Sequence, residues 1–234
     1  MAEIKAVLWD VDGTLLNFLA AERATLKLCF SLFGLGECTD ALIAEYSAIN
    51  ARWWQALERG EYTKQEITVG RFAEFFAAHG WDTAIAADFN AAYQLHLGET
   101  IVFCPNVQET LRALRGKVVQ CAVTNGTKIA QTIKLERSGL NRLLDPIFIS
   151  DDIGAEKPSK EFFAPVFAAL GGMRPEEMLI VGDSLTSDMR GGVNAGIQTC
   201  WYNPNGLAVP PEPHMDYIIS DIAEVLQIVE KSAR

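Results

Sequence analysis

The amino-acid sequence predicts an α/β protein, in which a Rossmann-like parallel sheet forms the core and an all-helical domain is inserted into it. The first observation is a short apolar run, Ile4 to Trp9, that is typical of a buried strand. The second is residues 17–97, where apolar residues recur at helical spacing. The third begins at Pro105, where helical segments alternate with short β-branched runs. Such alternation predicts a parallel sheet of right-handed βαβ units.

The order of these segments predicts how the domains are organised. A lone first strand could neither pair its backbone nor bury both faces, so it must join the sheet formed by the later strands. The helical stretch is therefore an insertion, and we expect a core domain of residues 1–16 and 105–234 and a cap domain of residues 17–104. The expected helices of the insertion are Ala20–Phe33, Asp40–Arg59, Lys64–His79 and Thr83–Leu97. The expected later strands are Val118–Val123, Pro146–Ile149, Met178–Val181, Thr199–Tyr202 and Tyr217–Ile219.

Composition narrows the classes of function. The 234 residues are 49% hydrophobic, which is ample for a packed core, and carry a formal net charge of -10. This acidity argues against binding to nucleic-acid polymers or anionic membranes, so any phosphate must be held by a local cation. The five cysteines are widely spaced with no C-x-x-C pair, which favours reduced thiols. We expect a cytoplasmic monomer or homodimer that acts on a small molecule.

Two carboxylates follow the first strand directly. Asp10 and Asp12 are separated by one residue, so a strand projects both side chains to the same side, and Gly13 allows a sharp turn after them. In this arrangement one acid could attack phosphorus while the other moves a proton. A calcium-binding loop can also begin in this way, but the apolar Leu15 and Leu16 and the missing third acid argue against it.

Further polar groups come where later strands are expected to end. Thr124-Asn125-Gly126 follows one strand and opens a helix, Lys157 precedes a proline, and Asp183 and Asp188 follow a third strand. Separately these are an ordinary turn, a solvated lysine and a helix cap. Their common place at the carboxyl ends of strands, where open α/β sheets bind ligands, favours one shared site. Carboxylates from Asp10 and Asp183 suit Mg²⁺, which prefers oxygen ligands.

These residues together resemble the haloacid dehalogenase superfamily, whose four motifs match Asp10-x-Asp12-x-Thr14, Thr124, Lys157 and Gly182-Asp183-x-x-x-x-Asp188 in order. The helical insert is similar to the first (C1) cap type of that superfamily. The resemblance implies that Asp10 is the nucleophile and Asp12 the general acid and base. It also implies Mg²⁺ held by Asp10, the Asp12 backbone carbonyl, Asp183 and Asp188. Thr124, Asn125, Gly126 and Lys157 would hold the phosphoryl group. Dehalogenases lack an acid at the position of Asp12, so a phosphatase is favoured.

Three stretches further resemble bacterial 5'-nucleotidases that act on pyrimidine nucleoside monophosphates, including noncanonical ones. They are Thr124–Gly126 with Leu135–Leu140, Ile149–Pro158, and Gly191–Gly196 with Thr199–Trp201. Gly13 is a departure, because several of these nucleotidases carry an acid there.

The substrate is left open between several classes. Phe18, Trp53 and Trp54 are candidates for stacking on a base, although aromatic residues on helices are more often core. The alternatives to a nucleotidase are a phosphatase of sugar phosphates or phosphoglycolate, a phosphomutase, and a non-catalytic phospholigand binder.

Overall fold

The computed structural model of the chain describes residues 2–233 and divides it into two compact units. The core unit is Met1–Phe18 with Ile101–Arg234, and the helical unit is Leu19–Thr100. The two segments that connect them pair with each other: the Asn17 N–H donates to the Val102 carbonyl at 2.8 Å and the Cys104 N–H to the Leu15 carbonyl at 3.0 Å. This pairing explains why residues 17–18 and 101–104 lie in the core unit, whereas the sequence placed them in the cap.

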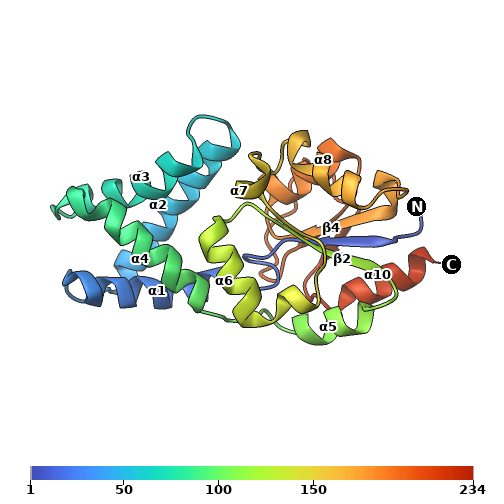
Figure 1. The fold of residues 1–234 in the computed structure, drawn as a ribbon, viewed down its shortest axis with the longest axis horizontal. Coiled ribbons are helices and arrows are strands. Elements are labelled where there is room, and N and C mark those ends of the chain that lie inside the picture. The colour runs from blue at the N-terminus through green and yellow to red at the C-terminus, as the bar shows by residue number, and fades with distance from the viewer. Residues whose placement is uncertain (1, 234) are drawn as a thin grey trace. The chain divides into compact units, whose positions relative to one another are not determined.

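The described residues of the core unit form a parallel six-stranded sheet, which confirms the predicted fold class (Figure 1). The strands lie in the order β3-β2-β1-β4-β5-β6, so the direction of winding reverses between β1 and β4. Trp9 at the end of β1 is level with Ala122 in β2 and Val181 in β4. Loops that follow β1 and β4 therefore diverge at a topological switch point, where doubly wound sheets bind ligands. The strands are β1 (Ala6–Trp9), β2 (Val119–Thr124), β3 (Ile147–Ile149), β4 (Met178–Gly182), β5 (Gln198–Tyr202) and β6 (Tyr217–Ile219).

Helices cover both faces of this sheet. Alternation along β1 sends Val7 and Trp9 into one hydrophobic cluster and Ala6 and Leu8 into another, as expected for a strand buried on both faces. The first cluster includes residues of α5 (Val107–Leu114), α6 (Lys128–Ser138) and α10 (Glu224–Ser232). The second includes residues of α8 (Lys160–Ala169), which lies on the opposite side of the sheet in Figure 1. The short helices α7 (Ser150–Ile153) and α9 (Arg190–Ala195) complete the crossovers.

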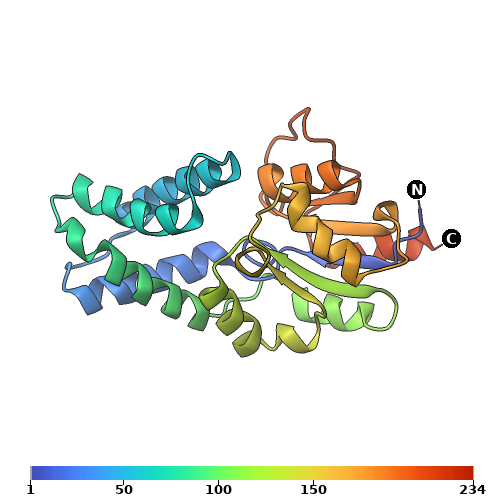
Figure 2. The same cartoon turned by 45° about the horizontal axis from the view of Figure 1, so that its top comes forward.

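The helical unit is built around aromatic side chains. Its helices are α1 (Phe18–Phe33), which begins at the last residue of the core unit, α2 (Asp40–Glu58), α3 (Lys64–Ala78) and α4 (Ala86–Glu99). Phe30 and Phe33 on α1 contact Phe89 on α4, and these two helices run side by side in Figure 2. The sequence predicted one helix from Thr83, but a 3₁₀ turn (Thr83–Ile85), capped by the Asp82 side chain, precedes α4. None of the described helices is long and apolar enough to cross a bilayer.

Candidate active site

Asp10 lies at the carboxyl end of β1, beside β4. Its backbone N–H donates to the Val181 carbonyl at 2.9 Å. This hydrogen bond to β4 fixes the position of the Asp10 main chain. One side-chain oxygen, Oδ1, accepts a hydrogen bond from Lys157 Nζ at 2.8 Å. The other, Oδ2, is buried and has no hydrogen-bond partner among the described residues. A buried carboxylate oxygen without a partner is costly, and it is the atom that is free to attack or to bind a cation.

Lys157 holds Asp10 in place. Its side chain is 1% exposed, and its ammonium donates to Asp10 Oδ1, to Asp188 Oδ1 at 2.6 Å and to the Val123 carbonyl at 2.7 Å. An ammonium has three protons, so these acceptors use all of them. Burial by itself lowers the pKa of Lys157, but the Asp10 and Asp188 carboxylates outweigh it and raise that pKa above its usual value. Lys157 is therefore a fixed positive charge that orients the carboxylate of Asp10.

The loop after β2 is tied to the backbone of Lys157. The Asn125 side chain donates to the Lys157 carbonyl and accepts from the Lys157 N–H, both at 2.8 Å. Thr124 Oγ1 accepts from the Gly126 N–H at 3.1 Å, which shapes the turn into α6. Asn125 was predicted to bind phosphate, and that stays a prediction. Its side chain is engaged in fixing Lys157, which leaves the backbone of the turn as the group able to approach a ligand.

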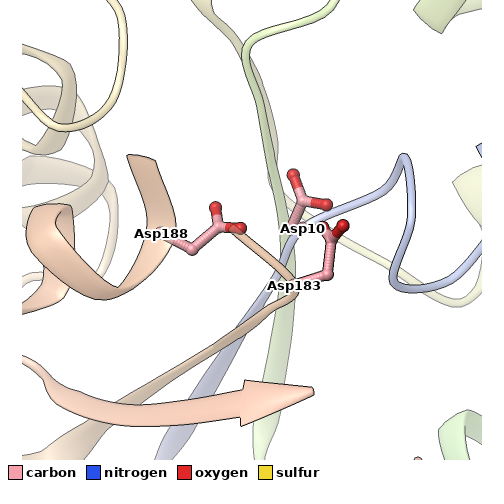
Figure 3. A group of neighbouring side chains, drawn as sticks. All are labelled: Asp10, Asp183 and Asp188. Carbon is pink, nitrogen blue, oxygen red and sulfur yellow. The ribbon is translucent and has the colours of Figure 1, made fainter. Parts of the chain in front are cut away.

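Three carboxylates gather above the ends of β1 and β4 (Figure 3). Asp10, Asp183 and Asp188 each offer one oxygen, and these atoms lie within 4.8 Å of one another. Asp188 lies on a π-helical turn, η4 (Leu185–Met189), and its Oδ2 accepts from the Ser184 N–H at 3.1 Å. π-Helical turns are often found at functional sites.

The charges in this cluster do not balance. Burial, the neighbouring Asp188 and the neighbouring Asp183 raise the pKa of Asp10 well above its usual value, even though Lys157 opposes them. Desolvation of the carboxyl group and the Asp188 charge raise the pKa of Asp183 to about 7, although its side chain keeps access to solvent. Three carboxylates thus share one ammonium. The oxygen-only donor set and the excess negative charge together fit a hard divalent cation.

Asp183 is supported from the loop that follows β1. The Thr14 hydroxyl donates to Asp183 Oδ1 at 3.4 Å, and the Trp201 indole donates to the Asp183 carbonyl at 3.0 Å. Gly13 has φ +93°, and a Cβ added to it would lie 2.4 Å from Asp183 Oδ2. The loop can pass this close to Asp183 only because residue 13 has no side chain.

Asp12 has partners that the sequence did not single out. Gln131 Nε2 donates to Asp12 Oδ2 at 2.6 Å, and the buried Lys134 ammonium donates to Asp12 Oδ1. Gln131 and Lys134 are three residues apart on α6 and share one helix face. The available signal was a glutamine and a lysine three residues apart in the helix that follows Thr124-Asn125-Gly126, beside the apolar Leu135. The Lys134 ammonium also lies 5.7 Å from the centre of the Phe18 ring.

Two tryptophans of the helical unit, Trp53 and Trp54, lie on α2. The Trp53 indole donates to Glu74 Oε2 at 2.8 Å, and its ring lies 4.9 Å from that of Tyr62. A Cβ added to Gly70 on α3 would lie 2.6 Å from this ring, so Trp53 packs between α2 and α3. Trp54 is half-buried. Contact of either ring with a base stays a prediction, and the surroundings of Trp53 give it a packing role.

A buried polar network runs through the same unit. Glu22 on α1 accepts hydrogen bonds from Asn50 Nδ2 at 3.0 Å and from the Ser47 hydroxyl. Arg71 on α3 donates to Asn50 Oδ1 at 2.6 Å. Burial raises the pKa of Glu22, against the opposing effect of the Ser47 hydrogen bond and the Arg71 charge. These polar groups pin α1, α2 and α3 together inside an otherwise apolar interior.

Comparison with known proteins places this site in a family. A model of the haloacid dehalogenase-like hydrolases matches residues 7–202. The HAD-hydrolase YfnB of Bacillus subtilis is 34% identical over 98% of this chain and 97% of its own. Its crystal structure bound to magnesium has a TM-score of 0.91, covering 97% of this chain and 99% of that one. The pyrimidine 5'-nucleotidases PynA of Streptococcus pneumoniae and YjjG of Escherichia coli are 31% and 30% identical. The PynA match covers 97% of this chain and 96% of PynA, and the YjjG match covers 96% of this chain and 97% of YjjG.

The family resemblance in the sequence is thereby confirmed. The matched region contains all four motif positions, from Asp10 through Thr124 and Lys157 to Asp183 and Asp188. The structure brings these motifs to one edge of the sheet. This chain is an enzyme that belongs to the haloacid dehalogenase-like hydrolases.

Proposed function

We propose that this protein is a Mg²⁺-dependent phosphomonoester hydrolase that works through an aspartyl phosphate and acts on pyrimidine nucleoside monophosphates. The state of Asp10 carries the proposal. Its Oδ1 is fixed by Lys157 while Oδ2 is buried and unpartnered beside two further carboxylates. An oriented carboxylate with one free oxygen, at the switch point of the sheet, is suited to nucleophilic attack on phosphorus.

Asp10 and Asp183, with Asp188 beside them, would hold Mg²⁺, together with the Asp12 backbone carbonyl. The ion would supply positive charge that shields the carboxylate nucleophile from the phosphate dianion. Asp10, Asp183 and Asp188 contribute three negative charges and Lys157 one positive charge, so a divalent cation balances this cluster.

In the first half-reaction Asp10 Oδ2 forms a bond to phosphorus as the bond from phosphorus to the ester oxygen breaks. Asp12, in its protonated form, gives its proton to the departing oxygen, so the alcohol leaves neutral. Lys157 keeps the Asp10 carboxylate turned toward phosphorus. The hydroxyl of Thr124 and the backbone N–H groups of the following turn would stabilise charge on the phosphoryl oxygens.

In the second half-reaction a water molecule attacks phosphorus. Asp12, now a carboxylate, takes a proton from this water, and the bond from phosphorus to Asp10 Oδ2 breaks. Inorganic phosphate leaves, Asp10 is again a carboxylate, and Asp12 is again protonated for the next cycle. The same side chain thus serves as acid and then as base.

The substrate class is supported by the relatives PynA and YjjG, both pyrimidine 5'-nucleotidases that match nearly the whole chain. The groups described above handle a phosphoryl group and carry no information about a base or sugar. We propose that the helical unit Leu19–Thr100 acts as a cap that selects the alcohol part of the substrate.

The proposal is tested by phosphate release from a panel of UMP, dUMP, dTMP, CMP, AMP, GMP, sugar phosphates and phosphoglycolate, each with Mg²⁺ and with EDTA. We expect Mg²⁺-dependent release with higher kcat/KM for the pyrimidine nucleotides. Preference for sugar phosphates or phosphoglycolate would overturn the substrate class and keep the chemistry. A requirement for a bisphosphate activator would indicate a phosphomutase, and binding without release from any compound would indicate a phospholigand binder.

Gly13→Ala should weaken Mg²⁺ binding, because the new Cβ would lie 2.4 Å from Asp183 Oδ2 and the residue must keep φ near +93°. We expect metal affinity to fall by about 10- to 100-fold, as for other changes to the groups that orient a metal ligand. The measurement is the Mg²⁺ concentration that gives half-maximal thermal stabilisation. Gly172→Ala is the matched control, since Gly172 has φ +91° with nothing within 4 Å of the added Cβ. Equal Mg²⁺ affinity in both variants would contradict the prediction.

A further inference from the structure

We infer that Lys134 and Gln131 are positioning residues that hold the Asp12 carboxylate in the direction needed for its proton transfers. The inference rests on the proposed function, in which Asp12 protonates the leaving oxygen. Lys134 donates to Oδ1 of Asp12 and Gln131 donates to Oδ2 at 2.6 Å, so each carboxylate oxygen has its own donor. With both oxygens engaged, the carboxyl group cannot rotate without losing one of the two bonds.

Burial of the Lys134 side chain costs desolvation free energy. Its side chain is 1% exposed, whereas that of Asp12 is 23% exposed. Burial of an ammonium is unfavourable unless it is paired, and here the pair is with the proposed acid and base. The Phe18 ring, 5.7 Å from the ammonium, adds a favourable cation–π contact from the start of α1. A lysine that served only helix stability would instead extend its charge into solvent.

Gln131 reaches Asp12 past the turn that precedes its helix. A Cβ added to Gly126 would lie 2.1 Å from Gln131 Nε2, so the amide passes against bare backbone. Since a carboxylate can only accept, the amide nitrogen must face Asp12. The Gln131 Oε1 is then left buried with no partner among the described residues. The glutamine therefore gives up a hydrogen bond to keep its N–H on Asp12.

Both residues come from α6, which begins at Lys128, with Thr127 between it and Thr124-Asn125-Gly126 as the N-cap. One rigid helix thus carries the turn that faces the phosphoryl group and, one turn later, the two donors that orient Asp12. This arrangement fixes the proton donor relative to the phosphoryl group with little freedom between them. It assigns a function to the glutamine and lysine that follow Gly126 by five and eight residues.

The test compares two substrates that differ in their need for the acid. Cleavage of UMP expels the 5'-alkoxide of uridine, which must be protonated, whereas cleavage of p-nitrophenyl phosphate expels the stabilised p-nitrophenolate. The ratio kcat/KM reports formation of the aspartyl phosphate and not its hydrolysis. For Lys134→Met and Gln131→Leu we expect kcat/KM on UMP to fall by about 10²-fold and on p-nitrophenyl phosphate by less than about threefold. Lys134→Arg should restore most of the loss on UMP.

Two further variants serve as controls. Asp12→Asn should show the same selective loss, and Thr132→Ala, on the exposed face of α6, should change neither substrate. An equal fall on both substrates would mean general damage to the site, and no fall on either would mean no role; each overturns the inference. Gln131→Leu keeps the buried ammonium, so it carries the test if Lys134→Met does not fold. Failure of the wild-type enzyme to hydrolyse either substrate would overturn the proposed function instead.

Discussion

Asp10→Asn is expected to abolish turnover while leaving the protein folded. The amide can still accept the Lys157 hydrogen bond through its oxygen, but its nitrogen cannot attack phosphorus, so kcat should fall by about 10⁴-fold or more. Because burial and the neighbouring Asp188 and Asp183 already raise the pKa of Asp10, removal of its charge relieves repulsion. The thermal midpoint without metal should therefore be equal to or above that of the wild type. Phosphate release and differential scanning calorimetry measure the two effects.

The matched control for this change is Glu230→Gln, a carboxylate-to-amide change at an exposed side chain that is paired with Lys117 at 3.4 Å. It should leave both kcat and the thermal midpoint unchanged. Turnover by Asp10→Asn within tenfold of the wild type would falsify the assignment of the nucleophile. Loss of fold in Asp10→Asn alone would show that the carboxylate is needed for structure.

Lys157→Met should destabilise the protein and inactivate it. The change leaves Asp10 and Asp188 without their shared cation in a site where both side chains are almost fully enclosed. Removal of one partner from a buried ion pair costs about 3–5 kcal/mol in the free energy of unfolding. The loss of an orienting charge should lower kcat by about 10²- to 10³-fold. Urea unfolding in the presence of EDTA, followed by steady-state kinetics in Mg²⁺, would measure both effects.

A double variant tests whether the unpaired carboxylates cause this instability. Asp188→Asn added to Lys157→Met removes one of the stranded carboxylates, so it should recover part of the lost free energy of unfolding. Lys117→Met, which breaks the exposed pair with Glu230, should cost less than about 1 kcal/mol. The buried-pair interpretation fails if Lys157→Met is no more destabilising than Lys117→Met.

The strands could be predicted from the sequence because each is a short apolar run bounded by polar residues. Met178–Val181 was expected and Met178–Gly182 is observed, and Tyr217–Ile219 agrees at both ends. The motif residues could also be placed, since the carboxyl ends of parallel strands meet at one edge. The order of the strands could not be predicted, because local pattern does not specify which strands pair. That order is what brings Asp183 beside Asp10.

Contacts made by long side chains were beyond the sequence for a different reason. The helical period shows that Gln131 and Lys134 share a face, but it does not show that this face is turned toward Asp12. The pairing of the Asn125 side-chain amide with the backbone of Lys157 was likewise not predicted from the sequence. Such contacts depend on how two loops approach each other, which no local pattern encodes.

Because the two connecting segments pair with each other, the helical unit could be removed or exchanged as one contiguous segment. The chain leaves the core through Leu15 to Asn17 and returns through Val102 to Cys104, and these segments are bonded to each other at 2.8 and 3.0 Å. Their ends are therefore already adjacent, so a short turn could join them with little loss of chain entropy. A helical domain of different shape could equally be grafted at this junction. Under the proposed function, exchange of one contiguous segment, residues 19–100, would change the substrate range and leave the residues proposed to handle phosphorus untouched.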